Sequence, residues 1–267
     1  MPASLQEILF ATQKGVAARR ASADRAELEF RAEKHVPRGF RQALERAAEG
    51  GVAVIAELKK ASPSKGVLRG NFPVSKMAVE LEQAGAAALS VLTEEKFFEG
   101  SLANLCEASA ATQLPCLRKD FIVDEFQLLE ARANGADAVL LIVAVLAVGQ
   151  LAALTARSRE LGLDVLCEVH DHRELQIALA AGCDLIGVNS RDLQTFEVNL
   201  ETVLRLGPRI PSPALRVAES GIQSSEDIQK LRAAGFHAFL IGESLMKAES
   251  PGEALRKLLA GVGPQRE

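Results

Sequence analysis

Residues 180–189 read AAGCDLIGVN, and this segment decides the fold because three other segments repeat its pattern. Each contains a glycine of the kind that ends a helix, followed by an apolar run of strand length. The glycines recur at nearly equal spacing, so the chain divides into quarters that each hold two β–α units. Four such quarters favour a closed (βα)8 barrel. The other segments are QAGAAALSVL (83–92), ANGADAVLLIV (133–143) and AAGFHAFLIGES (233–244).

The same alternation of apolar runs and helical segments extends from residue 52 to the end of the chain. It is typical of α/β proteins with a parallel sheet, and eight strands close a TIM barrel. An open doubly wound sheet would show the same rhythm, but no G-x-G-x-x-G motif follows the first strand. The predicted strands lie near residues 52–58, 87–92, 115–119, 138–143, 164–169, 184–189, 215–219 and 238–242.

Residues 1–50 precede the first predicted strand. The segments LQEILFATQKGVAARR (5–20) and DRAELEFRAEKH (24–35) predict two helices, and the charge-rich residues 31–41 predict a solvated face. These helices are too short to form a separate domain. We therefore expect an N-terminal helical extension over 1–50, packed on one mouth of the barrel, and a single catalytic (βα)8 barrel over 51–267.

The composition excludes several classes of protein. The 267 residues are 48% hydrophobic and 25% charged, as in an ordinary globular protein, and the net charge of −4 argues against a nucleic-acid partner. No apolar run is long enough to cross a membrane, and the first residues lack the features of a signal peptide. We expect a cytoplasmic monomer.

The cysteines and histidines do not predict a metal site. No C-x-x-C pair occurs, so the scattered cysteines are expected to be small core residues in a reducing compartment. Two histidines follow a predicted strand without a further ligand cluster, and they are read as the end of that strand and the start of a helix. The residues concerned are Cys106, Cys116, Cys167, Cys183, His170 and His172; tryptophan and tyrosine are absent from the chain.

Charged side chains stand at the ends of alternate predicted strands. If Ala53 and Ile55 point into the barrel, Glu57 and Lys59 do so too, at the end where barrel enzymes carry their active sites. Alternate strands contribute to the same layer of a barrel, so the charges ending the third, fifth and seventh strands should meet there. The sixth strand adds two polar residues on one face. The predicted active-site set is Glu57, Lys59, Lys119, Glu168, Asn189, Arg191 and Glu219.

Charges of both signs in one pocket indicate proton transfer on an anionic substrate. A lysine near other cations in a desolvated pocket has a lowered pKa and can serve as a general acid near neutral pH. A glutamate shielded from water has a raised pKa and becomes a better general base. Spacing alone leaves open which residue takes which part.

Small residues after the last two strands predict a phosphate site. Barrel phosphate sites are commonly built there, from backbone N–H groups and a helix N-terminus. The turns ESGI and IGES place Ser220, Gly221 and Gly242 at these positions, where the backbone could approach an anion closely.

Seven segments together resemble the indole-3-glycerol-phosphate synthase family of tryptophan biosynthesis, in its monofunctional form. They occur in the family's order and span nearly the whole chain. The segments are ELKKASPSKG (57–66), LSVLTEEKFFEGS (89–101), LRKDFIVDEFQ (117–127), CEVHD (167–171), GVNSRDL (187–193), VAESGI (217–222) and LIGESLM (240–246).

The resemblance implies a lyase that uses no cofactor and no metal. The family closes the ring of 1-(2-carboxyphenylamino)-1-deoxyribulose 5-phosphate, with loss of carbon dioxide and water, to give indole-3-glycerol phosphate. By resemblance, Lys119 is the general acid, and Glu168 is the carboxylate that assists proton removal and dehydration. The other implied residues are Glu57, Lys59, Asn189 and Glu219 around the reacting atoms, Arg191 at the substrate carboxylate, Ser62, Phe98, Phe121 and Leu193 around the anthranilate ring, and Ser220, Gly221 and Gly242 at the phosphate.

One position departs from part of the family. Glu243 stands where some members have serine beside the phosphate, and a carboxylate there would disfavour an anion unless it turned away. Two alternatives to the synthase stay open from the residues. One is another phosphate-binding barrel enzyme, such as phosphoribosylanthranilate isomerase, and the other is a non-catalytic sugar-phosphate binding protein.

Overall fold

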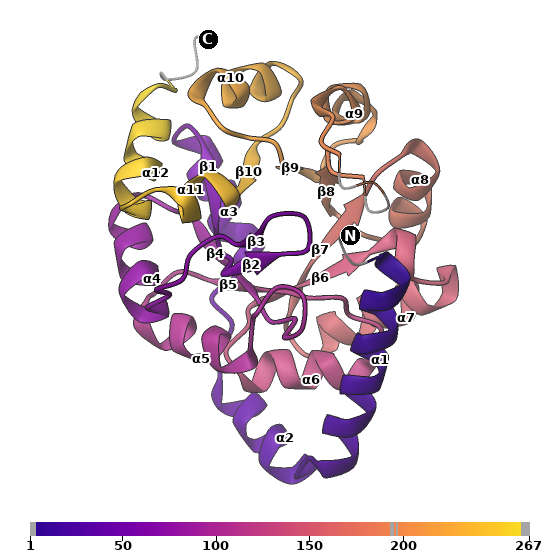
Figure 1. Ribbon diagram of the computed structural model, residues 1–267. Helices are drawn as coiled ribbons and strands as arrows, with labels where there is room; N and C mark the ends of the chain where they lie inside the picture. The colour runs from indigo at the N-terminus through magenta and orange to yellow at the C-terminus, as the bar shows by residue number, and fades with distance from the viewer. Residues whose placement is uncertain (1–3, 193–194, 196, 263–267) are drawn as a thin grey trace.

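The barrel is closed by eight parallel strands, as the sequence predicts. The computed structural model describes residues 4–192, 195 and 197–262, and Figure 1 shows the strands enclosed by helices. Within these residues the strands pair in the circular order β1-β10-β9-β8-β7-β6-β5-β4. Each lies within a residue or two of its predicted position: β1 (Ala53–Leu58), β4 (Ala88–Leu92), β5 (Cys116–Lys119), β6 (Ala138–Ile142), β7 (Asp164–Val169), β8 (Leu185–Asn189), β9 (Leu215–Glu219) and β10 (Ala238–Ile241).

Helices alternate with these strands and surround them. A helix ends two residues before the helix-ending glycine of each of the four repeated segments. The helices that follow the strands are α4 (Val74–Gln83), α5 (Leu102–Ala111), α6 (Glu125–Ala133), α7 (Val148–Glu160), α8 (His172–Ala180), α9 (Leu200–Leu206), α10 (Ser225–Ala233), α11 (Glu243–Lys247) and α12 (Pro251–Ala260), with short 3-10 turns at Val143–Val145 and Gly207–Arg209.

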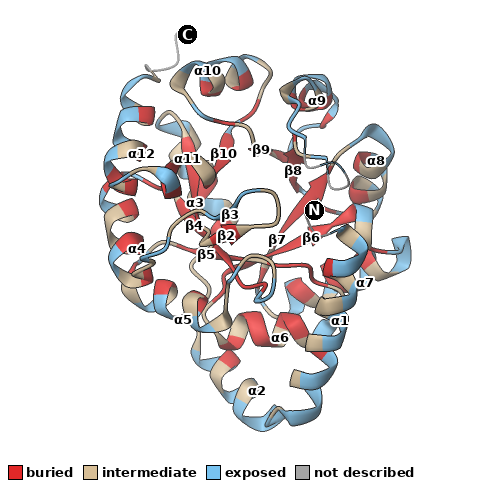
Figure 2. Ribbon diagram, in the orientation of Figure 1, coloured by how far each residue is buried: buried red, intermediate tan, exposed pale blue. Residues whose placement is uncertain are grey.

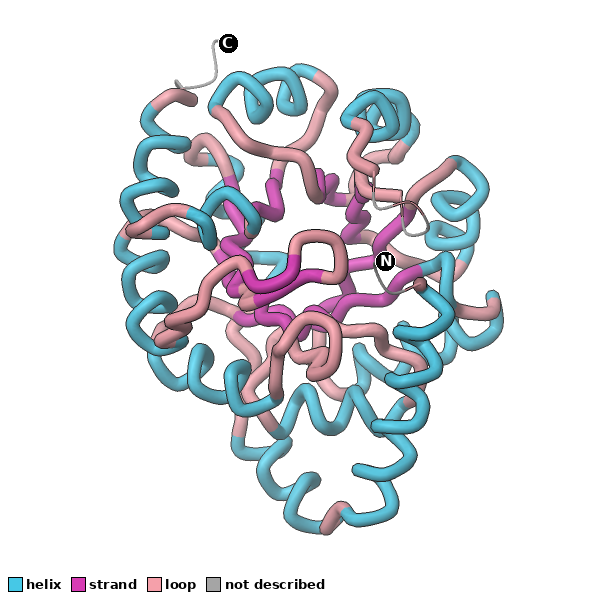
Figure 3. The backbone as a smooth tube through the Cα atoms, viewed as in Figure 1, coloured by secondary structure: helices cyan, strands magenta, loops and turns pink. Residues whose placement is uncertain are grey.

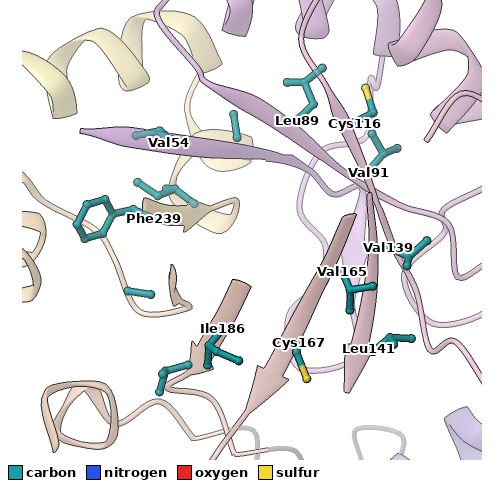
Figure 4. Packing of buried hydrophobic residues seen from close by; sticks show 14 of the residues in the cluster. Val54, Leu89, Val91, Cys116, Val139, Leu141, Val165, Cys167, Ile186 and Phe239 are labelled. Atoms are coloured by element: carbon teal, nitrogen blue, oxygen red, sulfur yellow. The ribbon is translucent and has the colours of Figure 1, made fainter. Parts of the chain in front are cut away.

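Successive strand residues pack into two different cores. In β1, Ala53 and Ile55 belong to the core inside the barrel, while Val54 and Ala56 belong to the core between the barrel and its helices. Figure 4 shows side chains of this outer core on several neighbouring strands. The strands are buried on both faces, as Figure 2 shows, which explains why they read as continuous apolar runs in the sequence. The alternation also fixes which strand-end residues point into the mouth.

The N-terminal extension contains three helices, so the prediction of two was incomplete. They are α1 (Leu5–Ser22), α2 (Arg25–Lys34) and α3 (Phe40–Glu49). The third begins inside the charge-rich segment 31–41, whose composition predicts a solvated face. Its charged residues do form one face, but Phe40 and Leu44 are fully buried on the other.

The extension reaches both ends of the barrel. Phe40 and Leu44 of α3 pack into the inner core, and Ile8 of α1 belongs to the same core. At the N-terminal end, Arg38 pairs with Asp137, which directly precedes β6, at 2.7 Å between Nη2 and Oδ2. At the other end, Leu5 and Ile8 line the pocket described below.

A short hairpin crosses the C-terminal mouth of the barrel. Strands β2 (Ala61–Ser62) and β3 (Gly66–Val67) pair antiparallel within the segment that follows β1. Figure 3 shows this hairpin in front of the ring of strands. The sequence predicts a loop here, and the hairpin is too short to show a strand pattern. In the described part of the chain, no helix has both the length and the apolar character needed to span a membrane.

Candidate active site

A large pocket opens at the C-terminal ends of the strands. It has a volume of about 1310 Å³, and its walls come from the strand ends, the hairpin, α1 and the loops around α9 and α11. Every predicted site residue that the structure describes lines this pocket. The predicted residues in its wall are Glu57, Lys59, Ser62, Phe98, Lys119, Phe121, Glu168, Asn189, Arg191, Glu219, Ser220, Gly221 and Gly242. Leu193 lies outside the described residues.

Lys119 stands at the centre of the charged cluster. It is the last residue of β5, and its Nζ lies 3.0 Å from Glu168 Oε2 and 2.5 Å from Glu219 Oε2. The preceding residue, Arg118, points to the opposite face, where it pairs with Asp120 at 2.9 Å and is 1% exposed. Because neighbouring residues of a strand point to opposite faces, this buried outer pair helps to fix the direction of Lys119.

Glu168 is held from three sides. Besides Lys119, its Oε1 accepts a hydrogen bond of 3.0 Å from Asn189 Nδ2 at the end of β8. The same oxygen lies 3.3 Å from Nε2 of His170. Glu168 is 2% exposed, so its orientation is set by these partners rather than by solvent.

Glu57 and Lys59 form a second ion pair beside the first. Lys59 Nζ lies 2.5 Å from Glu57 Oε1, and Ser90 Oγ donates to Glu57 Oε2 at 3.4 Å. A Cβ at Gly242 would lie 2.5 Å from Glu57 Oε1 and 2.9 Å from its Cβ. Gly242 therefore makes room for this glutamate, a purpose that the sequence did not indicate.

The expected lowering of the lysine pKa is wrong for the unliganded site. Burial alone would lower the pKa of Lys119, but the carboxylates of Glu168, Glu219 and Glu57 outweigh burial and raise it. The sequence placed Lys119 near other cations, whereas its direct partners are anions. Lys119 is therefore fully charged at neutral pH.

The two glutamates beside Lys119 have opposite pKa shifts. Burial, together with the nearby Glu168 carboxylate, raises the pKa of Glu219 to about 7 despite Lys119. Burial would also raise the pKa of Glu168, but Lys119, His170 and Asn189 reverse the effect and hold it below its usual range. The expectation of a shielded glutamate with a raised pKa is thus confirmed for Glu219 and wrong for Glu168. The arrangement places a fixed carboxylate and a carboxyl that titrates near neutrality against one ammonium group.

The predicted phosphate turns have an unusual backbone. Ser220 and Gly221 both have positive φ angles, of 63° and 75°. A serine in this region is strained, and such strain tends to occur at functional sites. After β10, α11 begins at Glu243 without a side-chain cap on its N-terminus. Backbone N–H groups at such an end favour an anion.

The negative charge of Glu243 is balanced by two neighbouring cations. Its carboxylate lies 2.6 Å from Lys247 Nζ and 3.4 Å from Arg191 Nη2. Burial would raise the pKa of Glu243, but Lys247 and Arg191 outweigh burial and lower it. The side chain still lines the pocket, so it remains an anion near the predicted phosphate turns.

An aromatic wall completes the pocket. The rings of Phe98 and Phe121 are 6.3 Å apart between centroids and tilted by 45°. The turn that carries Phe98 is held by Glu94, whose Oε2 accepts from the backbone N–H groups of Phe97 and Phe98 at 2.7 and 3.0 Å. Ser62 faces the same pocket from β2. An aromatic ring of a ligand could bind along this wall.

Two residues that support the site are not indicated by the sequence. His170 was read as a mere strand end, yet it contacts Glu168; its position two residues after Glu168, on the same face of the strand, was the available signal. Glu94 was not singled out, because a turn-capping carboxylate has no distinctive spacing. Among the described residues, no group of three or more His, Cys, Asp or Glu side chains could hold a metal ion.

Comparison with known proteins gives a consistent family. Residues 5–258 match the family described as indole-3-glycerol phosphate synthase. The chain is 58% identical over 259 residues to the indole-3-glycerol phosphate synthase of Koribacter versatilis, covering 97% of this chain and 100% of that protein. It is 51% identical over 259 residues to the protein of the same name from Bordetella pertussis, covering 96% and 98%.

Solved structures resemble the chain in fold alone. A 3-hexulose-6-phosphate synthase matches with a TM-score of 0.64 at 13% identity, over 79% of this chain and 100% of that chain. Thiamine phosphate pyrophosphorylase from Pyrococcus furiosus matches with a TM-score of 0.60 at 17% identity, over 80% and 96%. The sequence matches, which cover nearly the whole chain, are what decide the family. This chain belongs to the indole-3-glycerol phosphate synthase family.

Proposed function

We propose that the chain is an indole-3-glycerol phosphate synthase, a carboxy-lyase of tryptophan biosynthesis. It would close the ring of 1-(2-carboxyphenylamino)-1-deoxyribulose 5-phosphate with loss of carbon dioxide and water. Family membership supports this activity. The observation that carries it is Lys119, a largely buried ammonium group held between two carboxylates in the pocket.

Lys119 serves as the general acid in the first step. The ring carbon attacks the substrate carbonyl, and the oxygen of that carbonyl becomes an alkoxide that must be protonated. An alkoxide is a stronger base than a lysine amine, so the transfer is downhill even from a lysine with a raised pKa. The charged ammonium also stabilises the developing negative charge before the proton moves.

Glu168 serves as the base that assists proton removal and dehydration. Its low pKa keeps it ionised, and Asn189 holds it in place. Glu219 titrates near neutrality and contacts the same lysine, so it can return a proton to Lys119 after the lysine has protonated the alkoxide. Lys59, paired with Glu57, is an anion ligand and a second acid for the departing hydroxyl group.

The rest of the pocket holds the substrate at its two ends. Arg191 binds the substrate carboxylate, while Ser220, Gly221 and Gly242 surround the phosphate. Ser62, Phe98 and Phe121 line the anthranilate ring, and the resemblance implies the same contact for Leu193. Holding both ends while the proton arrives can supply about 7–11 kcal/mol of the barrier.

The proposal includes the organisation of the chain. Residues 1–50 serve as an extension of the barrel rather than as a domain of their own, which the burial of Phe40 and Ile8 against the inner core supports. Residues 51–267 form the catalytic barrel. We expect the protein to be a cytoplasmic monomer that needs no cofactor and takes a small phosphorylated substrate. Sedimentation of the purified protein tests whether it is a monomer.

Indole fluorescence gives a direct test of the activity. Because the chain has no Trp and no Tyr, the protein contributes almost no background at indole wavelengths. Adding the carboxyphenylamino substrate should produce growing indole emission. Substrate binding without emission would contradict the proposal and favour a sugar-phosphate binding protein.

A further inference from the structure

His170 lies between the proposed base and the first turn of a helix. It follows the last residue of β7, two positions after Glu168, so both side chains are on the same face of the chain. Its side chain is 16% exposed. None of the chemistry above uses this largely buried titratable group.

Each nitrogen of the imidazole ring faces a carboxylate. Nδ1 lies 3.0 Å from Glu174 Oε2, and the backbone N–H of His170 donates to the same oxygen at 2.7 Å. Nε2 lies 3.3 Å from Glu168 Oε1, close enough for an ion pair with a charged ring but without a hydrogen bond. Glu174 is itself fixed in the first turn of α8, where its backbone N–H donates to Asp171 Oδ1 at 2.8 Å.

This geometry favours a doubly protonated ring. A neutral imidazole has one N–H, so either tautomer would leave one ring nitrogen with its lone pair against a carboxylate oxygen. The imidazolium ion instead places a positive charge between the two carboxylates. Burial alone would lower the pKa of His170, but Glu168 and Glu174 outweigh burial and raise it to about 10.

Charges on neighbouring strands also act on Glu168. Lys119 contacts Glu168 Oε2 from β5, and Glu219 from β9 and Glu57 from β1 act on that lysine. Asn189 from β8 shares Glu168 Oε1 with His170. When Lys119 turns to the substrate carbonyl, Asn189 and His170 are the contacts that still hold Glu168.

We propose that His170 is a positioning residue for the reaction: as an imidazolium ion held by Glu174, it keeps Glu168 ionised and fixes the direction of its Oε1. The inference rests on the proposed function, in which Glu168 accepts a proton. It assigns to Glu174 a part in catalysis that acts only through His170.

The first test is the protonation state of the ring. Nitrogen NMR of the wild-type protein at about pH 8 should show both nitrogens of His170 protonated, although free histidine is neutral there. A single protonated nitrogen would overturn the proposal. This readout does not depend on turnover.

The second test is the pH profile of kcat in two variants. Glu174→Gln removes one of the two carboxylates that hold the proton on His170, so the alkaline limb of kcat should move to lower pH. His170→Gln should lower kcat about 10–100-fold, the usual cost of losing an orienting partner, with KM within about twofold. The variant that carries both substitutions should lack the shifted alkaline limb, because the imidazole that titrates there is gone.

A merely structural role would give a different result. It would lower kcat in Glu174→Gln without moving the alkaline limb, and that outcome would overturn the proposal. His172→Gln is the matched control, since the same substitution on the exposed neighbour should leave kcat and the profile unchanged. Glu168→Gln separates the two claims. If Glu168→Gln is inactive and the alkaline limb of Glu174→Gln stays at the wild-type pH, only the inference on His170 fails. Full turnover in Glu168→Gln overturns both the inference and the proposed role of Glu168.

Discussion

The two ends of the barrel each bury a cluster of charges, and the clusters differ in how well they are satisfied. The floor cluster, at the N-terminal ends of the strands, consists of His35, Arg38 and Asp137. The mouth cluster, at the C-terminal ends, consists of Glu57, Lys119, Glu168 and Glu219. Only the mouth cluster opens into the large pocket.

In the floor cluster every strong acceptor is occupied. Asp137 is completely buried and accepts from the backbone N–H groups of Arg38 and Cys116, both at 2.7 Å, from the Arg38 guanidinium, and from His35. Burial would raise its pKa, but His35, Arg38 and these N–H groups outweigh burial and lower it. The cluster joins the extension to the barrel and leaves no polar atom of Asp137 for a ligand.

In the mouth cluster, carboxylates compete for one ammonium group. Glu168 and Glu219 share Lys119, and Glu219 Oε1 is buried with no hydrogen-bond partner among the described residues. An unsatisfied buried oxygen is costly, and natural structures keep few of them. The contrast teaches that satisfied buried charges hold a fold together, whereas under-satisfied ones are held ready for a substrate or a proton.

The largest expected effect is on turnover at the mouth. Glu168→Gln keeps the shape of the side chain but cannot accept a proton, so kcat should fall by about 10²–10⁴-fold. Steady-state indole emission measures it, and a thermal unfolding curve close to that of the wild type confirms the fold. A tenfold or smaller loss would show that the mouth cluster does not act through this carboxylate.

Breaking the floor cluster should cost stability instead. Arg38→Met leaves the Asp137 carboxylate buried with only His35 and backbone donors, a change that typically destabilises by about 3–5 kcal/mol. Urea unfolding measures the loss. Turnover per folded molecule should stay near that of the wild type, and a large fall in turnover would break the division between the two ends.

The two clusters should also respond to pH with opposite signs. The pKa of Asp137 is lowered from 3.8, so its stabilisation is present above about pH 4 and disappears as pH falls further. The pKa of Glu219 is raised from 4.5 to about 7, so the folded state keeps a proton that the unfolded chain has released, and stability falls as pH rises through that window.

Urea unfolding of two variants over this range checks those signs. The gap in unfolding free energy between wild type and Asp137→Asn should narrow below about pH 4. Glu219→Gln should gain stability relative to wild type between about pH 4.5 and 7, and then keep a constant difference. The same sign of change in both variants would contradict the contrast.

The smallest expected effect is the loss of stability on breaking an exposed ion pair, which serves as a reference for the buried ones. Arg25→Met removes an arginine whose pair with Glu29, at 2.8 Å, is on the surface with side chains 75% and 50% exposed. Exposed pairs of this kind contribute about 0.3–0.5 kcal/mol. Urea unfolding should place this variant close to wild type, and a loss comparable to that of Arg38→Met would mean that burial is not what separates them.

The sequence predicted the barrel and its mouth because both depend on local periodicity. The helix-ending glycines and apolar runs marked each strand, and the period of two in β1 placed Glu57 and Lys59 on the face of Ala53 and Ile55. Strand-end position then identified the charges that meet. These inferences need only the alternation of side chains and the parallel direction of the strands.

The features that the sequence did not predict depend on contacts between residues far apart in the chain. The pKa of Lys119 rises because two carboxylates from other strands lie against it, and no spacing within β5 reveals that. Helix α3 was hidden because its buried face is carried by few residues in a charged segment. Asp137 was likewise overlooked, since its partners lie about 100 positions earlier in the chain.

The most direct measurement of the central claim is the turnover of Lys119→Met, made beside its thermal unfolding. The account predicts that indole emission falls by at least about 100-fold while the protein stays folded, because the acid is lost and the two freed carboxylates can protonate. Turnover close to that of the wild type in folded Lys119→Met would contradict it. In that case the mouth cluster would be a second structural cluster, like the one at the floor.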